Sequence, residues 1–210
     1  DKTYNATLLL GLDTDTQDTS GKVISKADTD SIMELSEDKV FETIKSYIGD
    51  YDQIPPMFSA IKIGGEKLYN LARRGEVIER PARHCRIIDI TVTKMELPRV
   101  DLHVTCSKGT YIRTLCHDIG KDLGVGGCME KLVRTKVERF SVEDSITLKQ
   151  IEEFRDNNTL EDYITPVDEM LGNYSKCMVS KGAEKLVYNG NIFTSGNTFL
   201  KMNHEDGQIV

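Results

Sequence analysis

The sequence predicts an α+β fold, and two hydrophobic patterns in its central part support that prediction. The first is a pair of period-2 runs on either side of a turn at Pro98, formed by Ile88, Ile90 and Val92 and by Val100, Leu102, Val104 and Cys106. This alternation is typical of an antiparallel strand pair with one buried face. The second is a helical stripe that follows directly and ends at Gly124, formed by Ile112, Leu115, Cys116, Ile119 and Leu123.

One strand and one helix are predicted before this centre. Residues 4–12 form an apolar, β-prone run that ends in the polar stretch of residues 13–18. Ser36 is the expected N-cap of a helix that ends at Gly49. We expect this helix to pack one face on the core through Val40, Phe41, Ile44, Tyr47 and Ile48.

The segment between this helix and the strand pair is predicted to be irregular. Pro55 and Pro56 keep residues 53–60 extended, because each proline excludes the helical region for the residue before it. A short helical pattern at Leu68, Leu71 and Ala72 then ends at Gly75.

The C-terminal part differs in character. Thr147 and Gln150 predict a capping box for a helix that uses Leu148, Ile151 and Phe154. After Pro166 the sequence predicts only a small helix over residues 180–190 and short strand-like pieces at residues 192–193 and 198–200. We therefore expect a domain boundary near residues 165–175.

Composition excludes some classes of protein. With 210 residues and 39% apolar content, the chain can bury one core and begin a second, smaller domain. Its apolar runs are far shorter than the roughly 20 residues that a membrane span needs, and no signal peptide is visible. The five cysteines are well separated and form no CxxC pair, which predicts a reducing cytoplasm and no structural zinc.

Charge is distributed unevenly along the chain. The net charge of -7 argues, taken alone, against a polyanionic partner. Residues 53–140, however, carry 16 Lys and Arg against 10 Asp and Glu, whereas residues 1–52 carry 5 against 12 and residues 141–210 carry 6 against 12. The central block is compatible with phosphate contacts, and equally with an ordinary solvated surface.

The acidic stretch after the first strand is a candidate calcium loop. Asp13, Asp15 and Asp18 have suggestive spacing, but Asp18 stands where the loop needs glycine and Ile24 where it needs a bidentate glutamate. We therefore predict a tight turn stabilised by side-chain-to-backbone hydrogen bonds.

A basic arm follows the proline segment. Between residues 62 and 86, seven basic residues face three acids: Lys62, Lys67, Arg73, Arg74, Arg80, Arg83 and Arg86 against Glu66, Glu76 and Glu79. Tyr69 and Arg73 lie four apart on the short helix and so share a face. Such an arm suits a nucleic-acid groove, although charge alone fits a solvated loop as well.

The junction between the second strand of the pair and the helix, residues 106–115, is a candidate anion site. Gly109 permits close backbone approach, the helix start offers free N–H groups, and Lys108 and Arg113 add positive charge. The alternative is a helix start whose Arg113 pairs with a structural carboxylate.

Together these segments resemble the TruB family of tRNA pseudouridine synthases over about residues 1–170. The resemblance is carried by Lys2-Thr3-Tyr4 with Leu10 to Asp18, by Gln53 to Lys62, by Tyr69 to Gly75, and by Cys106 to Leu115 continuing to Leu132-Val133-Arg134-Thr135 and Phe140. Four motifs in one order and spacing are far more specific than any one of them.

The resemblance implies an activity and an architecture. The family isomerises uridine 55 in the T-loop of tRNA without cofactor or metal, so it implies tRNA as partner, a cytoplasmic location and no obligatory protein partner. Its fold is a mixed, largely antiparallel sheet flanked by helices, with a PUA-like C-terminal domain. Here it implies an incomplete pseudouridine synthase core over residues 1–168 with an RNA-binding insertion at about 56–84, and a partial PUA-like domain over residues 169–210.

The resemblance also implies roles for single residues. Tyr4 matches the tyrosine that stacks on the flipped uracil, and Tyr111 and Leu132 match further contacts to the target nucleotide. Arg113 matches the arginine that pairs with the catalytic aspartate. The expected RNA contacts are Lys62, Lys67, Tyr69, Arg73, Arg74, Lys108 and Arg134.

One departure bears on activity. The family nucleophile lies in a Gly-His-x-Gly-x-Leu-Asp-Pro motif upstream of the Lys-x-Tyr segment, and the 210 residues contain nothing like it. We expect a piece of a longer enzyme that is inactive alone. Three smaller departures put details of the RNA contact in doubt. They are Phe58 in place of the usual tyrosine, Val133 in place of a usual arginine and Glu138 in place of a usual glycine.

Two other functions fit the same residues. The first is a non-catalytic RNA-binding module or a scaffold of an RNA-modification complex. The second is a cytosolic domain without an RNA role, which predicts no salt-dependent tRNA binding.

Overall fold

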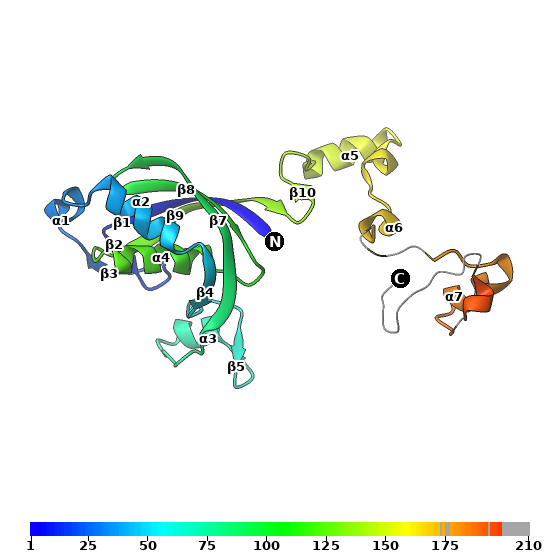
Figure 1. Cartoon of the computed structure of the whole chain (residues 1–210), viewed down its shortest axis with the longest axis horizontal. Helices are drawn as coiled ribbons and strands as arrows, with labels where there is room; N and C mark the ends of the chain where they lie inside the picture. Colours follow the sequence, from blue (N-terminus) through cyan, green and yellow to red (C-terminus); the bar gives the residue numbers. More distant parts are fainter. Residues whose placement is uncertain (173, 175–176, 193, 199–210) are drawn as a thin grey trace. The chain divides into compact units, whose positions relative to one another are not determined.

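The computed structural model describes residues 1–172, 174, 177–192 and 194–198 (Figure 1). By their contacts the residues divide into two compact units, one from Asp1 to Ser145 and one that begins at Ile146. The sequence also predicts that a partial PUA-like domain begins at residue 169. That domain assignment remains a prediction.

A six-stranded sheet is the centre of the first unit, in the order β10-β9-β1-β8-β7-β4. Its strands are β1 (Lys2–Leu10), β4 (Gly49–Gln53), β7 (Arg83–Glu96), β8 (Arg99–Cys106), β9 (Gly127–Val137) and β10 (Phe140–Ser141). Each neighbouring pair in this sheet is antiparallel. The α+β fold predicted from the sequence is therefore confirmed.

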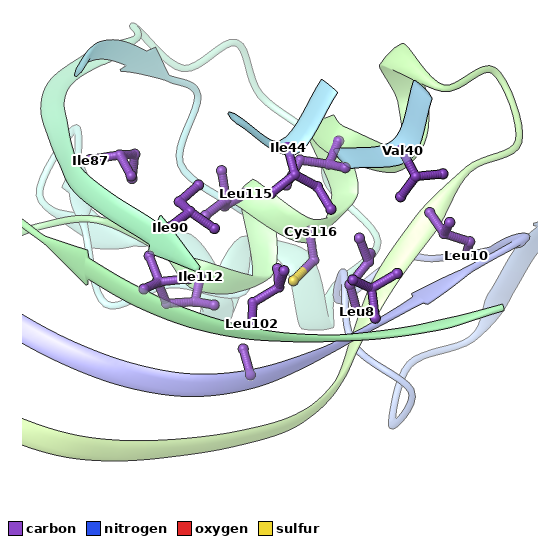
Figure 2. Packing of buried hydrophobic residues seen from close by; sticks show 14 of the residues in the cluster. Leu8, Leu10, Val40, Ile44, Ile87, Ile90, Leu102, Ile112, Leu115 and Cys116 are labelled. Atoms are coloured by element: carbon purple, nitrogen blue, oxygen red, sulfur yellow. The ribbon is translucent and has the colours of Figure 1, made fainter. Parts of the chain in front are cut away.

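Two helices pack on the sheet and enclose the core. They are α2 (Glu37–Ser46), which contacts β7, and α4 (Ile112–Asp122), which contacts β1 and β9. Figure 2 shows Leu8 and Leu102 of the sheet facing Ile44 of α2 and Leu115 of α4, and all four are at most 1% exposed. Burial of each such side chain stabilises the fold by about 1.5–3 kcal/mol.

The expected strand over residues 4–12 is interrupted. Gly11 adopts a φ of +82°, which L side chains rarely adopt, and the chain turns there. Leu12 begins β2 (Leu12–Thr14), which pairs with β3 (Val23–Lys26) in a separate two-stranded sheet. The short helix α1 (Thr29–Met33) follows β3.

The predicted alternation in β7 is wrong at one position. Ile88 was expected in the core with Ile90, but it is 43% exposed, and its neighbour Ile87 is fully buried. The register against β8 shifts between Ile87 and Asp89. A bulge adds one residue to one strand and so reverses the faces of the residues before it.

The N-cap of α2 follows the prediction, but the expected end at Gly49 is wrong, because the helix ends at Ser46 with Tyr47 as its C-cap and Gly49 begins β4. The apolar face of α2 is also narrower than expected. The Ser36 side chain accepts a hydrogen bond from the Lys39 N–H at 3.3 Å. Val40 and Ile44 are fully buried, whereas Phe41 is 44% exposed.

The insertion forms a subdomain with its own small core. It contains β5 (Lys62–Ile63), β6 (Glu66–Lys67) and α3 (Leu68–Arg73). Met57, Leu68 and Leu71 are buried together, and Phe58 and Ile78 pack against them. The insertion is therefore a folded element with a charged surface.

The second unit is mainly helical where it is described. It contains α5 (Leu148–Asp156), η1 (Leu160–Tyr163), α6 (Val167–Met170), η2 (Lys181–Ala183), α7 (Glu184–Tyr188) and η3 (Ser195–Asn197). The predicted capping box of Thr147 and Gln150 is confirmed. The helix expected over residues 180–190 is present as η2 and α7.

The two strand-like pieces expected near the C-terminus are only partly described. Ile192 lies in no strand, and Thr198 forms an isolated bridge with Val179. Residues 193, 199 and 200 lie outside the described residues. No helix in the described part is both long and apolar enough to cross a bilayer.

Candidate functional site

The start of α4 is the centre of the candidate site. After β8 the chain turns through Gly109, which has a φ of +89°, and Thr110 closes the turn by donating to the Ser107 carbonyl at 3.0 Å. Tyr111 is the extended N-cap residue of α4 and has no side-chain cap bond. Arg113 therefore lies in the first helical turn, where its side chain can reach past the helix end.

Gln53, the last residue of β4, holds the backbone of Tyr111. Its amide oxygen accepts from the Tyr111 N–H at 2.8 Å, and its amide nitrogen donates to the Tyr111 carbonyl at 3.0 Å. Gln53 is only 2% exposed. A buried amide with both hydrogen bonds made gives a fixed position to the residue that it pairs with.

The Arg113 guanidinium joins three segments that are distant in the sequence. Nη1 donates to the Thr16 carbonyl at 3.1 Å and to Asp18 Oδ2 at 3.1 Å, and Nη2 donates to the Phe58 carbonyl at 2.8 Å. The Arg113 side chain is 21% exposed and that of Asp18 is 18% exposed. The planar guanidinium is thus held in one orientation by these three acceptors.

Asp18 lies in the acidic turn that follows β2. One of its carboxylate oxygens accepts from the Ser20 N–H at 3.0 Å and from the Thr16 hydroxyl at 2.8 Å. The Thr19 N–H donates to the Met129 carbonyl at 3.0 Å, which fixes the turn to β9. The tight turn predicted here is confirmed, and the pairing with Arg113 is the alternative that the sequence left open for that arginine.

Hydrogen bonds control the ionisation of Asp18. Burial raises the pKa of this carboxyl group, but hydrogen bonds from Ser20, Thr16 and Arg113 together outweigh it and hold the pKa below its ordinary value. The carboxylate therefore stays ionised beside Arg113 at neutral pH.

This shift predicts a pH dependence of stability. Because the pKa is lower in the folded chain than in the unfolded chain, Asp18 contributes stability above the unfolded value of about 4, and loses it as pH falls through the folded value. Asp18→Asn should cost about 1–2 kcal/mol at pH 7. In urea unfolding between pH 7 and pH 2.5, its deficit should shrink toward the acid end. The exposed control Glu42→Gln should stay within about 0.5 kcal/mol, and a deficit independent of pH would contradict the assignment.

Tyr4 lies at the same end of the sheet as the start of α4. In β1 it pairs with Val104 of β8, two residues before the end of that strand, and it packs against the main core. Since Tyr4 alternates with Ala6 and Leu8, its ring is on the face that α4 covers. Burial raises the pKa of its hydroxyl, which is therefore neutral at pH 7.

Leu132 and Arg134 lie on β9 beside β1. Leu132 pairs with Ala6 and is 40% exposed, and Arg134 pairs with Tyr4 and is exposed. The register therefore places Tyr4, Arg134 and the α4 start at one end of the sheet, while a shared cavity for Tyr4, Tyr111 and Arg113 remains a prediction.

The basic residues of the insertion differ in their surroundings. Lys67 Nζ and the Arg73 guanidinium each lie 5.3 Å from the centre of the Tyr69 ring. Arg74 instead forms ion pairs with Glu66 at 2.6 Å and with Glu76 at 2.7 Å. Tyr69 and Arg73 share a face as predicted, whereas Arg74 is engaged by two carboxylates.

Lys62 and Lys108 are both exposed, the first on β5 and the second in the turn before α4. Among the described residues, no group of three or more His, Cys, Asp or Glu side chains could hold a metal ion.

Sequence reasoning missed two residues of this site. Asp18 was assigned to a turn, and nothing in its spacing signals an arginine 95 residues later. Gln53 was noted only as part of a proline segment. The sequence offers one indication of its role: Gln53 is a polar residue immediately before Ile54-Pro55-Pro56, and it follows a predicted helix and turn.

Comparison with known proteins gives the same family for both parts of the chain. Residues 1–112 match the model of the TruB family pseudouridylate synthase N-terminal domain, and residues 113–172 match that of the tRNA pseudouridylate synthase B C-terminal domain. A tRNA pseudouridine synthase B of Clostridium tetani is 46% identical over 90% of this chain and 63% of its own length. One of Alkaliphilus oremlandii is 44% identical over 100% of this chain and 68% of its own length.

Solved structures show the same fold. A Cbf5-Nop10-Gar1 complex matches 94% of this chain and 51% of its own chain, with a TM-score of 0.64 and 25% identity. An H/ACA RNP bound to a substrate RNA that contains 2'-deoxyuridine matches with a TM-score of 0.61 and 21% identity, over 94% of this chain and 50% of its own. With two family domains covering residues 1–172 and relatives above 40% identity, the chain belongs to the TruB family of pseudouridine synthases.

Proposed function

We propose that the protein containing this chain isomerises uridine 55 in the T-loop of tRNA to pseudouridine. The observation that carries this proposal is the fixed start of α4, where Gln53 holds the Tyr111 backbone and Arg113 is oriented by three segments. The names of the relatives supply the substrate class.

The reaction requires the target base outside its stack, because the bond between the ribose and the base nitrogen must break and a bond to a base carbon must form. Extruding a base costs a few kcal/mol. Stacking on an aromatic ring returns about 1–3 kcal/mol per base. In the proposal Tyr4 provides this stacking, Tyr111 and Leu132 line the nucleotide site, and Arg113 holds the attacking aspartate ionised and aimed.

The attacking aspartate is proposed to lie outside the 210 residues. Their sequence contains no Gly-His-x-Gly-x-Leu-Asp-Pro motif, and the curated relatives are longer than this chain, which spans 63% of the Clostridium tetani protein. In this chain Arg113 pairs with Asp18 through one nitrogen, and its second nitrogen bonds a backbone carbonyl.

The proposed RNA partner is the T-arm of tRNA. Lys62, Lys67, Tyr69, Arg73 and Arg74 of the insertion would contact the backbone, with Lys108 and Arg134 nearer the target. The solved relative Cbf5 was crystallised with Nop10 and Gar1. We propose that the present protein acts on tRNA without an obligatory protein partner.

An assay of pseudouridine formation tests this proposal. The chain alone should bind unmodified tRNA in a salt-dependent manner and form no pseudouridine, because the nucleophile is absent. Adding an upstream segment with the aspartate motif should produce one pseudouridine per tRNA, and none in a tRNA with cytidine at position 55.

Two outcomes would count against it. Turnover by the chain alone would refute the missing-nucleophile argument. Continued inactivity with the upstream segment, together with tight tRNA binding, would favour a non-catalytic RNA-binding module.

A further inference from the structure

Arg80, at the end of the insertion, is a basic residue that has no assigned role. Two of its side-chain nitrogens, Nε and Nη1, are buried, and no atom of the described residues accepts a hydrogen bond from either. Buried charged groups are otherwise paired, since an unpaired one costs several kcal/mol in desolvation. Burial also lowers the pKa of Arg80, although an arginine remains charged.

Arg80 lines a cavity of about 380 Å³, large enough for a ligand group. Its walls come from the acidic turn, the proline segment, the end of α3 and the middle of α4, including Asp15, Met57, Phe58, Glu76 and His117. Met57 and Phe58 form an apolar part of this wall beside the charged side chains.

The other charged side chains of the cavity wall each have an ion-pair or hydrogen-bond partner within the chain. Glu76 pairs with Arg74 at 2.7 Å, and His117 Nδ1 lies 2.9 Å from Asp13 Oδ1. Asp15 Oδ1 accepts from the Lys22 N–H at 2.7 Å. In the described lining, Arg80 is thus the cation without a carboxylate partner.

The cavity adjoins the candidate site. Phe58 lines it, and the Phe58 carbonyl accepts from Arg113. His117 lines it as well and lies four residues after Arg113 in α4, one helical turn away. The cavity therefore lies beside the start of α4, which the proposed function assigns to the target nucleotide.

We propose that Arg80 and this cavity bind a phosphate group, the phosphodiester of the RNA strand next to the target nucleotide. The identification of this phosphate as part of an RNA strand rests on the proposed function. The existence of an anion site at Arg80 does not depend on that function. Nε and Nη1 are shielded and lie on either side of the Cδ atom, so the side chain would turn toward the cavity and offer the phosphate its Nε–H and Nη2–H pair, the bidentate geometry that guanidinium groups favour. The unpaired arginine is then a binding group whose burial costs stability in the free chain.

Two measurements on the 210-residue chain test the site. The first is thermal unfolding with inorganic phosphate against sodium chloride of equal ionic strength. Phosphate should raise the midpoint of the wild type and not that of Arg80→Gln. Without phosphate, Arg80→Gln should unfold at a higher temperature than the wild type, since it removes a buried unpaired charge. A lower midpoint, or equal stabilisation of both by phosphate, would overturn the anion site.

The second measurement is tRNA affinity as a function of salt. Arg80→Gln should weaken binding about tenfold at low salt, and reduce the slope of log K against log salt by about 0.7–0.9, the value for one phosphate contact. Arg80→Lys should keep most of the slope. The control Arg99→Gln, which removes an exposed pair with Glu130, should change neither.

The two arms separate the two proposals. If phosphate acts through Arg80 but the chain does not bind tRNA, the anion site stands and the RNA function fails. If the chain binds tRNA with the same slope with and without Arg80 and phosphate has no effect, the RNA function stands and this inference is wrong.

Discussion

Replacing Arg113 with alanine is expected to lower the rate of pseudouridine formation by about 10³-fold in the protein that carries the aspartate motif. Arg113 is fixed by Asp18 and by the Thr16 and Phe58 carbonyls, so its guanidinium orientation is set before substrate binds. Losing it removes the charge that holds the nucleophile ionised and aimed. The tRNA affinity should change by less than about threefold, because most phosphate contacts remain.

The measurement is single-turnover kinetics together with equilibrium tRNA binding. Arg113→Lys should restore little, since an ammonium cannot reproduce a fork that reaches three acceptors. Arg99→Ala is the control and should leave both quantities unchanged. Comparable losses in rate and affinity would make Arg113 a phosphate contact instead.

Gly120→Ala should destabilise the chain by about 3 kcal/mol, although helix propensity alone predicts a gain of about 1 kcal/mol. Gly120 is buried inside α4, and a Cβ atom there would overlap the backbone of Gly126 and Gly127. Because backbone atoms at a β9 strand start cannot rotate away, α4 would have to move off the sheet.

Urea unfolding measures this effect. The neighbouring exposed position gives the control, because Lys121→Ala should stay within about 0.5 kcal/mol. The displaced helix carries Arg113, so in the protein that carries the aspartate motif Gly120→Ala should also lower the rate of pseudouridine formation. A variant as stable as the wild type would show that the helix and the sheet are not in the close contact described.

The elements of the fold were largely predictable because they depend on local patterns. The period-2 run over Val100, Leu102 and Val104 and the capping box at Thr147 both follow from neighbours in the sequence. The bulge that exposes Ile88 did not follow, because it depends on the register of β7 against β8. Apolar residues at both positions 87 and 88 leave the sequence ambiguous there.

The site was predictable only in part. The resemblance of the junction at residues 106–115 identified Arg113, but not its acceptors, which lie 97, 95 and 55 positions away. Arg80 was one of seven basic residues of similar context, and only burial distinguishes it. Contacts and burial are properties of the assembled chain, so charge and spacing could not reveal them.

The position of β1 in the sheet has a consequence for synthesis. β1 leaves the ribosome before both of its neighbours in the sheet, because β8 starts at Arg99 and β9 at Gly127, 97 and 125 residues after Lys2. Until then an apolar strand with two unpaired edges is available to other chains, which is the situation that favours aggregation. Pairing across such long sequence separations is also slow, because loop closure must precede it. Rapid overproduction is therefore expected to demand chaperone protection of the segment from Lys2 to Leu10.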